Sequence, residues 1–435
     1  MPPDQLDIAF APLAIGLDAT AATRRRAGKA DRVAGLVGVA LGVADLAAAS
    51  LRTSHSDAIG VVLAEPPGRR CHLLQRRFEE LFGGPRRVAE GPLTEREFDL
   101  AASVQQVTEE IVVRLARTAQ ETTGETKLCL AGGVALNCVA NGAVVRERLY
   151  DEVWVQPAAG DAGGALGAAL AVAARRTGTR QHVSSGRDAM RGARLGPAFT
   201  DGEIQAYLDE NGFPYERFGE HELAPAVAGH LAEAKVVGWF QGRMEFGPRA
   251  LGARSILADA RNPDMQAVMN LKIKFRESFR PFAPAVLAES AEHYFQLKQD
   301  SPYMLLVAEV ADDMRVDAGD PTGKTGLDLL KMPRSTIPAV THVDYSARVQ
   351  TVGPEAEPAY RRLLAAFHDL TGCAVLINTS FNVRGEPIVR SPQEAYGCFM
   401  RTNIDVLVLG SFVLLKGVQP EWRETVDWRS DIPLD

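Results

Sequence analysis

The chain has 435 residues, a formal net charge of −7 and a pI of about 5.7. Because a typical domain holds about 100–200 residues, this length predicts two or three domains. Hydrophobic residues make up 46% and charged residues 24%, which excludes a chain that is disordered throughout. The acidic balance argues against a nucleic-acid partner and against a cationic membrane-binding surface.

The cysteines and histidines carry no disulfide or metal-binding signature. The 5 cysteines form no Cys-x-x-Cys pair and their number is odd, so neither a disulfide framework nor a zinc ribbon is indicated. The closest two histidines are His221 and His230. No apolar run approaches the ~20 residues of a membrane-spanning helix. We therefore expect a cytoplasmic protein without a membrane segment.

Residues 1–70 differ in composition from the rest of the chain. They contain a single aromatic residue, Phe10, and are rich in alanine. Because aromatic side chains supply much of the buried area of a core, this segment can bury little area per residue. We interpret it either as a pair of alanine-rich amphipathic helices or as a segment outside the native fold.

A long helix is predicted over residues 95–122, where apolar side chains recur at helical spacing. A buried strand over residues 127–130 follows, and then a turn with Gly132 and Gly133 ahead of Asn137. A glycine turn between a strand and a helix lets the backbone approach a phosphate or a sugar closely. The alternative is tight packing of the strand against the helix.

The same arrangement recurs a few residues later. A strand over residues 153–155 is followed by a loop and by a helix of small residues that opens at Asp161. Asp161 occupies the position of an N-cap, and it is interpreted either as a cap or as a metal ligand. Helix glycines such as Gly163 cost about 1 kcal/mol each relative to alanine, so we expect a backbone or a ligand to approach them closely.

A basic, glycine-rich loop follows a second buried strand. Residues 177–194 are polar and are interpreted as a linker. Further along, a strand is predicted over residues 235–240, and it is followed by the sequence QGRMEFGPRALGARS, residues 241–255. Arg243 and Arg249 lie there among glycines, and arginine suits phosphate and carboxylate oxygens. The alternative is a solvated basic loop.

A cationic row is predicted between residues 270 and 284. If Lys272, Lys274 and Arg276 lie on a strand, the alternation of side chains places all three on one face. Ile273 and Phe275 then point to the core. Such a row suits a polyphosphate.

A last buried strand, over residues 374–377, leads into a polar stretch that contains Ser380 and Asn382. These side chains offer a hydroxyl and an amide to a sugar or a phosphate, although turns favour the same residue types. Arg348, in the segment 341–350, is a further cation in this half of the chain.

Two of these motifs resemble one lobe of a known enzyme domain. Residues 130–137 and residues 156–167 resemble the second lobe of the actin/hexokinase-like (Kae1-like) domain of O-carbamoyltransferases of the nodulation-protein-U type.

The later motifs resemble the YrdC-like C-terminal domain of the same family. They are residues 241–255, residues 270–284 and residues 374–387. The chain departs from the family pattern at Tyr345, because the family usually has glycine after the position of Asp344.

The resemblance covers roughly residues 75–425 and implies an α/β fold. After the atypical segment 1–70, it implies a partial Kae1-like lobe over residues 71–180 and a YrdC-like α/β domain over residues 195–425.

The resemblance implies a two-step transferase reaction. Carbamoyl phosphate and ATP give carbamoyl adenylate at the YrdC-like domain, and the carbamoyl group then passes to a hydroxyl of a small-molecule acceptor, a natural product or a sugar. Positive charge would offset the repulsion between the two anionic substrates. The implied catalytic residues are Lys274, Arg276 and Arg249. The implied ligand-binding residues are Gly132, Gly133, Asn137, Gly163, Arg243, Arg348, Ser380 and Asn382.

The resemblance also implies a metal. Asp161 matches the one metal ligand that the second lobe contributes, while the family's His-His-x-x-His-Ala motif has no match in this sequence. Iron or another divalent metal is therefore implied with an incomplete set of ligands, besides Mg²⁺ with ATP. We expect the transfer step to be impaired if the first lobe is absent.

Three other interpretations stay open. The chain is an actin-like-fold kinase if it forms ADP rather than AMP and pyrophosphate, or a non-catalytic nucleotide-binding remnant if it binds ATP without carbamoyl-dependent chemistry. Transfer to a tRNA base is the third, and the acidic balance counts against it. The oligomeric state stays open as well: two-lobed enzymes of this kind often pair, which makes a homodimer one alternative.

Overall fold

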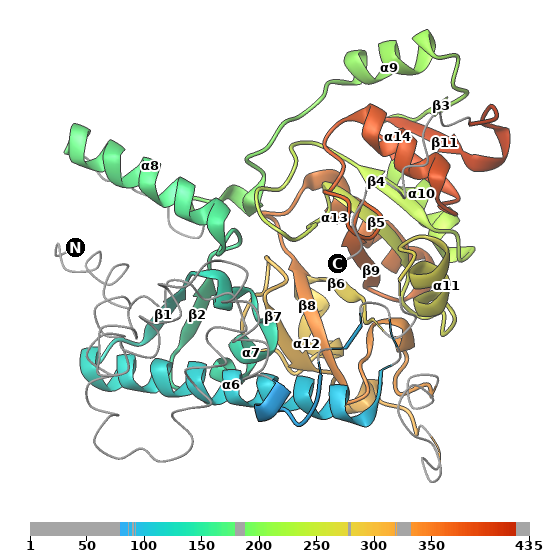
Figure 1. Cartoon of the computed structure of the whole chain (residues 1–435). Helices are drawn as coiled ribbons and strands as arrows, with labels where there is room; N and C mark the ends of the chain where they lie inside the picture. Colours follow the sequence, from blue (N-terminus) through green and yellow to red (C-terminus); the bar gives the residue numbers. More distant parts are fainter. Residues whose placement is uncertain are drawn as a thin grey trace. The chain divides into compact units, whose positions relative to one another are not determined.

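The computed structural model describes residues 79–85, 87–88, 91, 93–178, 188–276, 280–317, 319 and 332–422 (Figure 1). The predictions for residues 1–70 lie outside the described residues, and so does half of the linker expected at residues 177–194. The chain divides into two compact units, one ending at Trp154 and the other beginning at Val155. The family domains expected over residues 71–180 and 195–425 stay predictions.

The first unit contains the predicted long helix, α6 (Glu95–Thr123). Its N-terminus is fixed by a capping box, in which the backbone N–H of Thr94 donates to Oε2 of Glu97 at 3.0 Å. Its C-terminus is set by Gly124, whose φ of 71° is the left-handed conformation that ends many helices. The prediction over residues 95–122 is confirmed.

The rest of the first unit follows the predicted order of strand, glycine turn and helix. β1 (Lys127–Leu130) leads through a 3₁₀ turn over Gly133–Leu136 into α7 (Cys138–Arg146), and β2 (Glu152–Val155) pairs with β1 in a two-stranded sheet. Gly132 has a φ of 95°, which an L side chain rarely adopts, so the turn needs a glycine there.

The second unit begins with the end of β2 and with α8 (Asp161–Thr177), whose side chains are all at least partly exposed. The N-cap of α8 is Gly160, and the cap makes no side-chain hydrogen bond. The N-cap interpretation of Asp161 is therefore wrong by one position: its carboxylate lies in the first turn, where the helix dipole favours negative charge.

A nine-stranded mixed sheet forms the core of the second unit, in the order β3-β11-β10-β4-β5-β9-β6-β8-β7. β10 pairs with β4 and β6 pairs with β8 in parallel, and the other pairs are antiparallel. The apolar runs predicted at residues 235–240 and 374–377 form β4 and β9. The strand bounds are β3 (Glu216–Arg217), β4 (Val237–Phe240), β5 (Arg254–Asp259), β6 (Ala283–Leu287), β7 (Leu306–Glu309), β8 (Ser346–Val352), β9 (Val375–Ser380), β10 (Val406–Leu409) and β11 (Phe412–Leu415).

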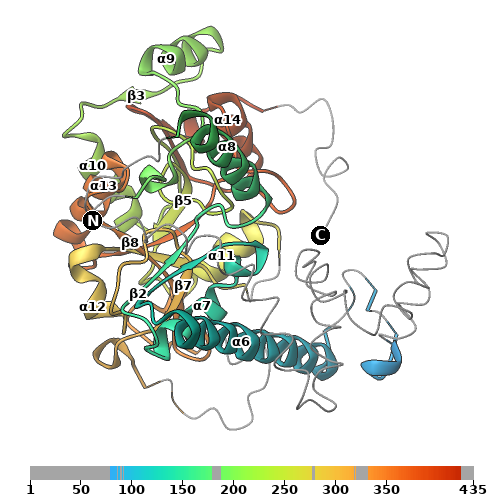
Figure 2. The same ribbon diagram turned by 90° about the vertical axis from the view of Figure 1, so that its left-hand side faces the viewer.

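Helices cover this sheet. α10 and α13 pack against each other and on β4, β5, β6 and β9, while α14 packs on β4 and β10 from the other side (Figure 2). No helix in the described part of the chain is long and apolar enough to cross a membrane. The helix bounds are α9 (Asp201–Glu210), α10 (Leu223–Ala232), α11 (Met265–Lys272), α12 (Ala291–Tyr294), α13 (Pro358–Thr371) and α14 (Pro392–Arg401). The mixed α/β fold class is confirmed.

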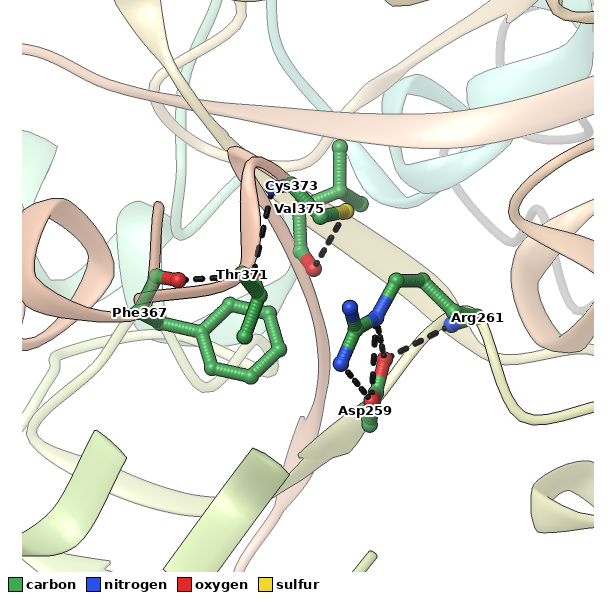
Figure 3. A network of polar contacts seen from close by, with 6 residues as sticks. All are labelled: Asp259, Arg261, Phe367, Thr371, Cys373 and Val375. Carbon is green, nitrogen blue, oxygen red and sulfur yellow. Dashed lines mark hydrogen bonds and ion pairs between the residues drawn. The ribbon is translucent and has the colours of Figure 1, made fainter. Parts of the chain in front are cut away.

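A polar network closes the sheet where β5 ends and β9 begins (Figure 3). Asp259, 4% exposed, accepts hydrogen bonds from Arg261, among them one at 3.0 Å from Nε to Oδ1 and one at 2.6 Å from Nη2 to Oδ2. The guanidinium of Arg261 also lies 5.3 Å from the ring centre of Phe367. Because these polar groups satisfy one another, this end of the sheet is structural, and the candidate site lies at the opposite end.

The strand predicted over Lys272, Lys274 and Arg276 is wrong. α11 ends at Lys272, and the chain then turns through Phe275, whose φ is 49°. Ile273 and Lys274 are both buried while Lys272 is exposed, so the three cations do not alternate on one face. The preceding residues form α11, whose Met265 and Met269 are buried within the second unit, and this packing outweighs the local strand pattern.

Candidate functional site

Polar side chains from three strands meet on one face of the nine-stranded sheet. We call them the polar strip: Ser255 on β5, Asn378 and Ser380 on β9, and Arg348 and Gln350 on β8. Ser255 pairs with Ser380 in the register of β5 and β9, and residues two apart on a strand share a face. β6 lies between β9 and β8 (Figure 1).

Small residues on β6 let the strip continue across it. Ala283 pairs with Asn378 and Ala285 pairs with Gln350. Nδ2 of Asn378 donates to Oε1 of Gln350 at 2.7 Å, over the methyl side chains of β6. A larger residue at Ala285 would fill the space that this hydrogen bond crosses.

The glycine-rich loop is anchored on the polar strip. Asn378 donates to the carbonyl of Ala250 at 3.1 Å, and Nε2 of Gln350 donates to the carbonyl of Leu251 at 3.0 Å. Gln350 was not predicted as a site residue. The signal that would have found it is an amide between the apolar residues of a strand that also carries Arg348, because a buried amide must find partners.

A buried carboxylate shapes the same loop from inside. Oε1 of Glu245, a residue 5% exposed, accepts the backbone N–H groups of Leu251 at 2.6 Å and Ala253 at 2.8 Å. Gly252 has a φ of 104°, and a Cβ built there would meet the ring of Tyr360 at 2.1 Å. The loop therefore has one closely packed conformation that requires glycine at this position.

The arginines of the loop separate into two kinds. Arg254 is fully buried, its guanidinium lies 3.5 Å from the ring centre of Phe240, and its Nη1 donates to the carbonyl of Gln241 at 2.9 Å. Burial lowers the pKa of Arg254 to about 10. Arg254 therefore holds the loop together, whereas Arg243 is exposed and Arg249 half-buried.

Lys274 is a second deeply buried cation of the candidate site, at 3% exposure. Its Nζ donates to the carbonyl and Oδ1 of Asn382, both at 2.8 Å, and to the carbonyl of Ser380. Burial lowers the pKa of Lys274 to about 7, and the nearby charge of Arg276 acts in the same direction. The structure therefore brings three of the predicted residues, Lys274, Ser380 and Asn382, into direct contact.

Arg276 lies two residues from Lys274 and is held by its neighbours. Its Nε donates to Oδ1 of Asn270 at 2.7 Å, and its guanidinium lies 5.1 Å from the ring centre of Phe282. These contacts orient a half-buried guanidinium beside the start of β6.

The side chains at the end of β9 are hydrogen-bonded to one another. Oγ of Ser380 donates to Oδ1 of Asn382 at 2.7 Å, and Nδ2 of Asn382 donates to the carbonyl of Glu386 at 2.6 Å. Both ends of the Asn382 amide are thus occupied by protein groups, and this residue orders the turn. Ser380 stays half-buried at the end of the strip.

The residues of the first unit that were predicted to bind ligand, Gly132, Gly133 and Asn137, lie in and directly after the glycine turn. Nothing lies within 4 Å of a Cβ built at Gly132 or Gly133, so the turn has open space on its side-chain face. Asn137 caps α7 by accepting the N–H of Ala140 at 3.1 Å, and its Nδ2 donates to Gln105 at 2.9 Å. Its amide is thus used within the protein.

The described residues do not fit a transition-metal site at Asp161. No group of three or more histidine, cysteine, aspartate or glutamate side chains able to hold a metal is found in the described part of the chain. Asp161 is exposed at the start of α8. One carboxylate is a poor ligand set for iron, so no chemical step is derived through a metal here.

The fold and the polar strip define an α/β protein with cations and hydrogen-bond donors gathered at one end of a mixed sheet, an arrangement that suits phosphate-bearing ligands. Comparisons with known families make this class specific. The model for the carbamoyltransferase C-terminus matches residues 228–416, and the model for the carbamoyltransferase N-terminus matches residues 69–170. The chain belongs to the carbamoyltransferase family, which confirms the family predicted from the sequence.

Similar proteins are longer than this chain. An uncharacterized protein of Synechocystis is 55% identical over 371 residues, covering 83% of this chain and 59% of its own length. Nodulation protein NolO of Bradyrhizobium diazoefficiens is 40% identical over 331 residues, covering 75% of this chain and 56% of its own length. The chain thus spans somewhat more than half the length of these two relatives.

Among solved structures, full-length HypF in its phosphate- and nucleotide-bound form aligns with a TM-score of 0.26 and 17% sequence identity. The alignment covers 46% of this chain and 22% of that chain.

Proposed function

We propose that the second unit activates carbamoyl phosphate with ATP to carbamoyl adenylate, and that the carbamoyl group is then transferred to a hydroxyl of a small-molecule acceptor. The observation that carries this proposal is the contact of Lys274 with Ser380 and Asn382 at the end of β9, with Arg348 two strands away on the same face of the sheet. Membership of the carbamoyltransferase family supports the carbamoyl group as the transferred unit.

The reaction balances with water as the co-reactant. Water cleaves carbamoyl phosphate to carbamate and phosphate, a carbamate oxygen then attacks the α-phosphorus of ATP, and pyrophosphate leaves. Two anions approach each other in this step, so fixed positive charge lowers its barrier. Arg276 and Arg348, both half-buried, are assigned to the phosphate oxygens, and Ser380 to hydrogen bonding.

We assign two roles to Lys274: it positions Ser380, and it supplies positive charge. Its Nζ is directed at protein oxygens at the end of β9, so it holds the hydroxyl of Ser380 and the turn after it in place. Mg²⁺ would accompany the triphosphate of ATP as part of the substrate. The iron implied by the family would need ligands in addition to Asp161.

The glycine-rich loop is assigned to the nucleotide. Its backbone is fixed by Glu245, Arg254 and the polar strip, so Arg249 and Arg243 extend from a rigid loop. In the first unit, the open space at Gly132 and Gly133 is assigned to the transfer step.

Arginine substitutions test this assignment. With ATP and Mg²⁺ present, we expect Arg348→Ala and Arg276→Ala to lower carbamoyl-phosphate-dependent pyrophosphate release by about 10²-fold, the usual effect of removing one charge-stabilising group. Arg390→Ala is the matched control, because this arginine is exposed and pairs with Glu394 on the surface. Thermal unfolding of each variant separates loss of chemistry from loss of fold. Release that is unchanged in both site variants would remove the assignment.

A further inference from the structure

A histidine beside the polar strip has a buried ring nitrogen that the proposed reaction leaves unassigned. His342 lies just before β8, and its backbone N–H donates to the carbonyl of Ser346 at 2.9 Å. Its Nε2 atom is buried and has no hydrogen-bond partner among the residues that the structure describes. A buried nitrogen without a partner is costly, so it points to a group that binds there.

Ser346 and Asp344 determine which ring nitrogen of His342 carries the proton. Oγ of Ser346 donates to Oδ1 of Asp344 at 2.7 Å, and the backbone N–H of Ser346 donates to the same oxygen at 3.1 Å. Since the hydroxyl proton of Ser346 is directed at Asp344, its oxygen accepts from Nδ1 of His342, 3.2 Å away. This network assigns the proton to Nδ1 and leaves Nε2 with a free lone pair.

The imidazole is neutral at neutral pH. Burial lowers the pKa of His342 to about 4, and the charge of Arg348 acts in the same direction, while Asp344 opposes it. Nε2 is therefore a hydrogen-bond acceptor under the conditions of an activity assay.

The strand register places this acceptor at the polar strip. Ser346 precedes Arg348 by two residues on β8, so its hydroxyl lies on the same face as Arg348 and Gln350. Because the imidazole is bonded to that hydroxyl and interacts with the charge of Arg348, it lies at the edge of the strip. A ligand bound by Arg348 would have its neighbouring atoms near His342.

We propose that Nε2 of His342 accepts a hydrogen bond from the NH₂ group of the carbamoyl substrate and so selects carbamoyl phosphate over acyl phosphates that carry a methyl group in that place. The inference rests on the proposed function. A carbamoyl group differs from an acetyl group by NH₂ in place of CH₃. Only the first can satisfy the buried nitrogen, and a site built around such a hydrogen bond rejects the analogue that lacks it.

Binding preference tests the proposal without depending on turnover. Calorimetric titration of the full chain with carbamoyl phosphate and with acetyl phosphate gives the ratio of their dissociation constants. We expect His342→Leu, which fills similar space without an acceptor, to lower this preference at least about tenfold. His342→Gln, whose side-chain oxygen can accept the same hydrogen bond, should keep it within about threefold.

Activity provides the second readout. The ratio of pyrophosphate release with the two phosphates should change in parallel with the ratio of binding constants. An unchanged preference in His342→Leu, with ATP binding and thermal unfolding intact, would overturn the inference, and so would an equal loss in His342→Gln. If the wild-type chain prefers carbamoyl phosphate in binding but releases no pyrophosphate, the proposed function is contradicted, and loss of that preference in His342→Leu would still support His342 as the selecting residue.

Discussion

Tyr345 has a φ of 62°, the left-handed conformation that glycine adopts without strain. This is the position where the sequence departs from the glycine of the family pattern, and for a residue with a Cβ the conformation costs about 1–2 kcal/mol. Two contacts offset the cost: the N–H of Tyr345 donates to the carbonyl of His342 at 3.1 Å, and the guanidinium of Arg315 lies 5.1 Å from its ring centre. The tight turn around His342 is thus kept with a different residue.

His342 also makes stability depend on pH in a defined window. Because its pKa is about 4 in the folded chain and about 6.5 when unfolded, the unfolded state binds more protons between these values. The free energy of unfolding therefore falls as the pH falls from 6.5 to 4, by about 1–3 kcal/mol from this residue. Urea unfolding at several pH values should show this slope in the wild type and a smaller slope in His342→Leu. Parallel curves for the two proteins would show that the imidazole is not buried as described.

At the scale of single elements, helical spacing of apolar residues was sufficient to predict α6, and short apolar runs were sufficient to predict the buried strands β4 and β9. The cationic segment after α11 was mispredicted, since period-two charge is weak evidence for a strand when the chain turns at Phe275. The contact of Lys274 with the end of β9 joins residues more than a hundred positions apart, and local patterns carry no information about it. The resemblance to a family supplied those residues.

Two neighbouring glycines of α8 allow a matched test of close packing. A Cβ at Gly163 would lie 2.1 Å from the carbonyl oxygen of Ala158, whereas a Cβ at Gly164 would meet nothing within 4 Å. We expect Gly163→Ala to lower the unfolding free energy by about 1–3 kcal/mol through overpacking. Gly164→Ala should be neutral or stabilising by up to about 1 kcal/mol, because alanine favours the helix. Chemical denaturation of both variants checks this, and equal effects would show that Gly163 is not held against that carbonyl.

The close approach of Gly163 to the carbonyl of Ala158 also explains why a glycine stands at this position, which the sequence analysis had assigned to ligand binding. Gly163 was expected to approach either a backbone or a ligand, and the structure brings it to the backbone of the loop before α8. A ligand role at Gly163 therefore stays a prediction, and Gly132 and Gly133 have the open space that such a role needs.

At the scale of the whole molecule, the two units differ in how much core they provide. Among the described residues, the second unit contains a nine-stranded sheet with helices on both sides and the polar strip, whereas the first unit contains a two-stranded sheet. Activation of the carbamoyl group, assigned to the second unit, is therefore the step that we expect this chain to perform by itself.

Product analysis with the purified chain tests this account most directly. The chain is incubated with Mg²⁺, α-labelled ATP and carbamoyl phosphate, and the nucleotide products and pyrophosphate are quantified with and without carbamoyl phosphate. We expect AMP or its carbamoyl ester, with pyrophosphate in equal amount, only when carbamoyl phosphate is present. Formation of ADP, or pyrophosphate release that does not depend on carbamoyl phosphate, would contradict the assignment of the polar strip to carbamoyl activation.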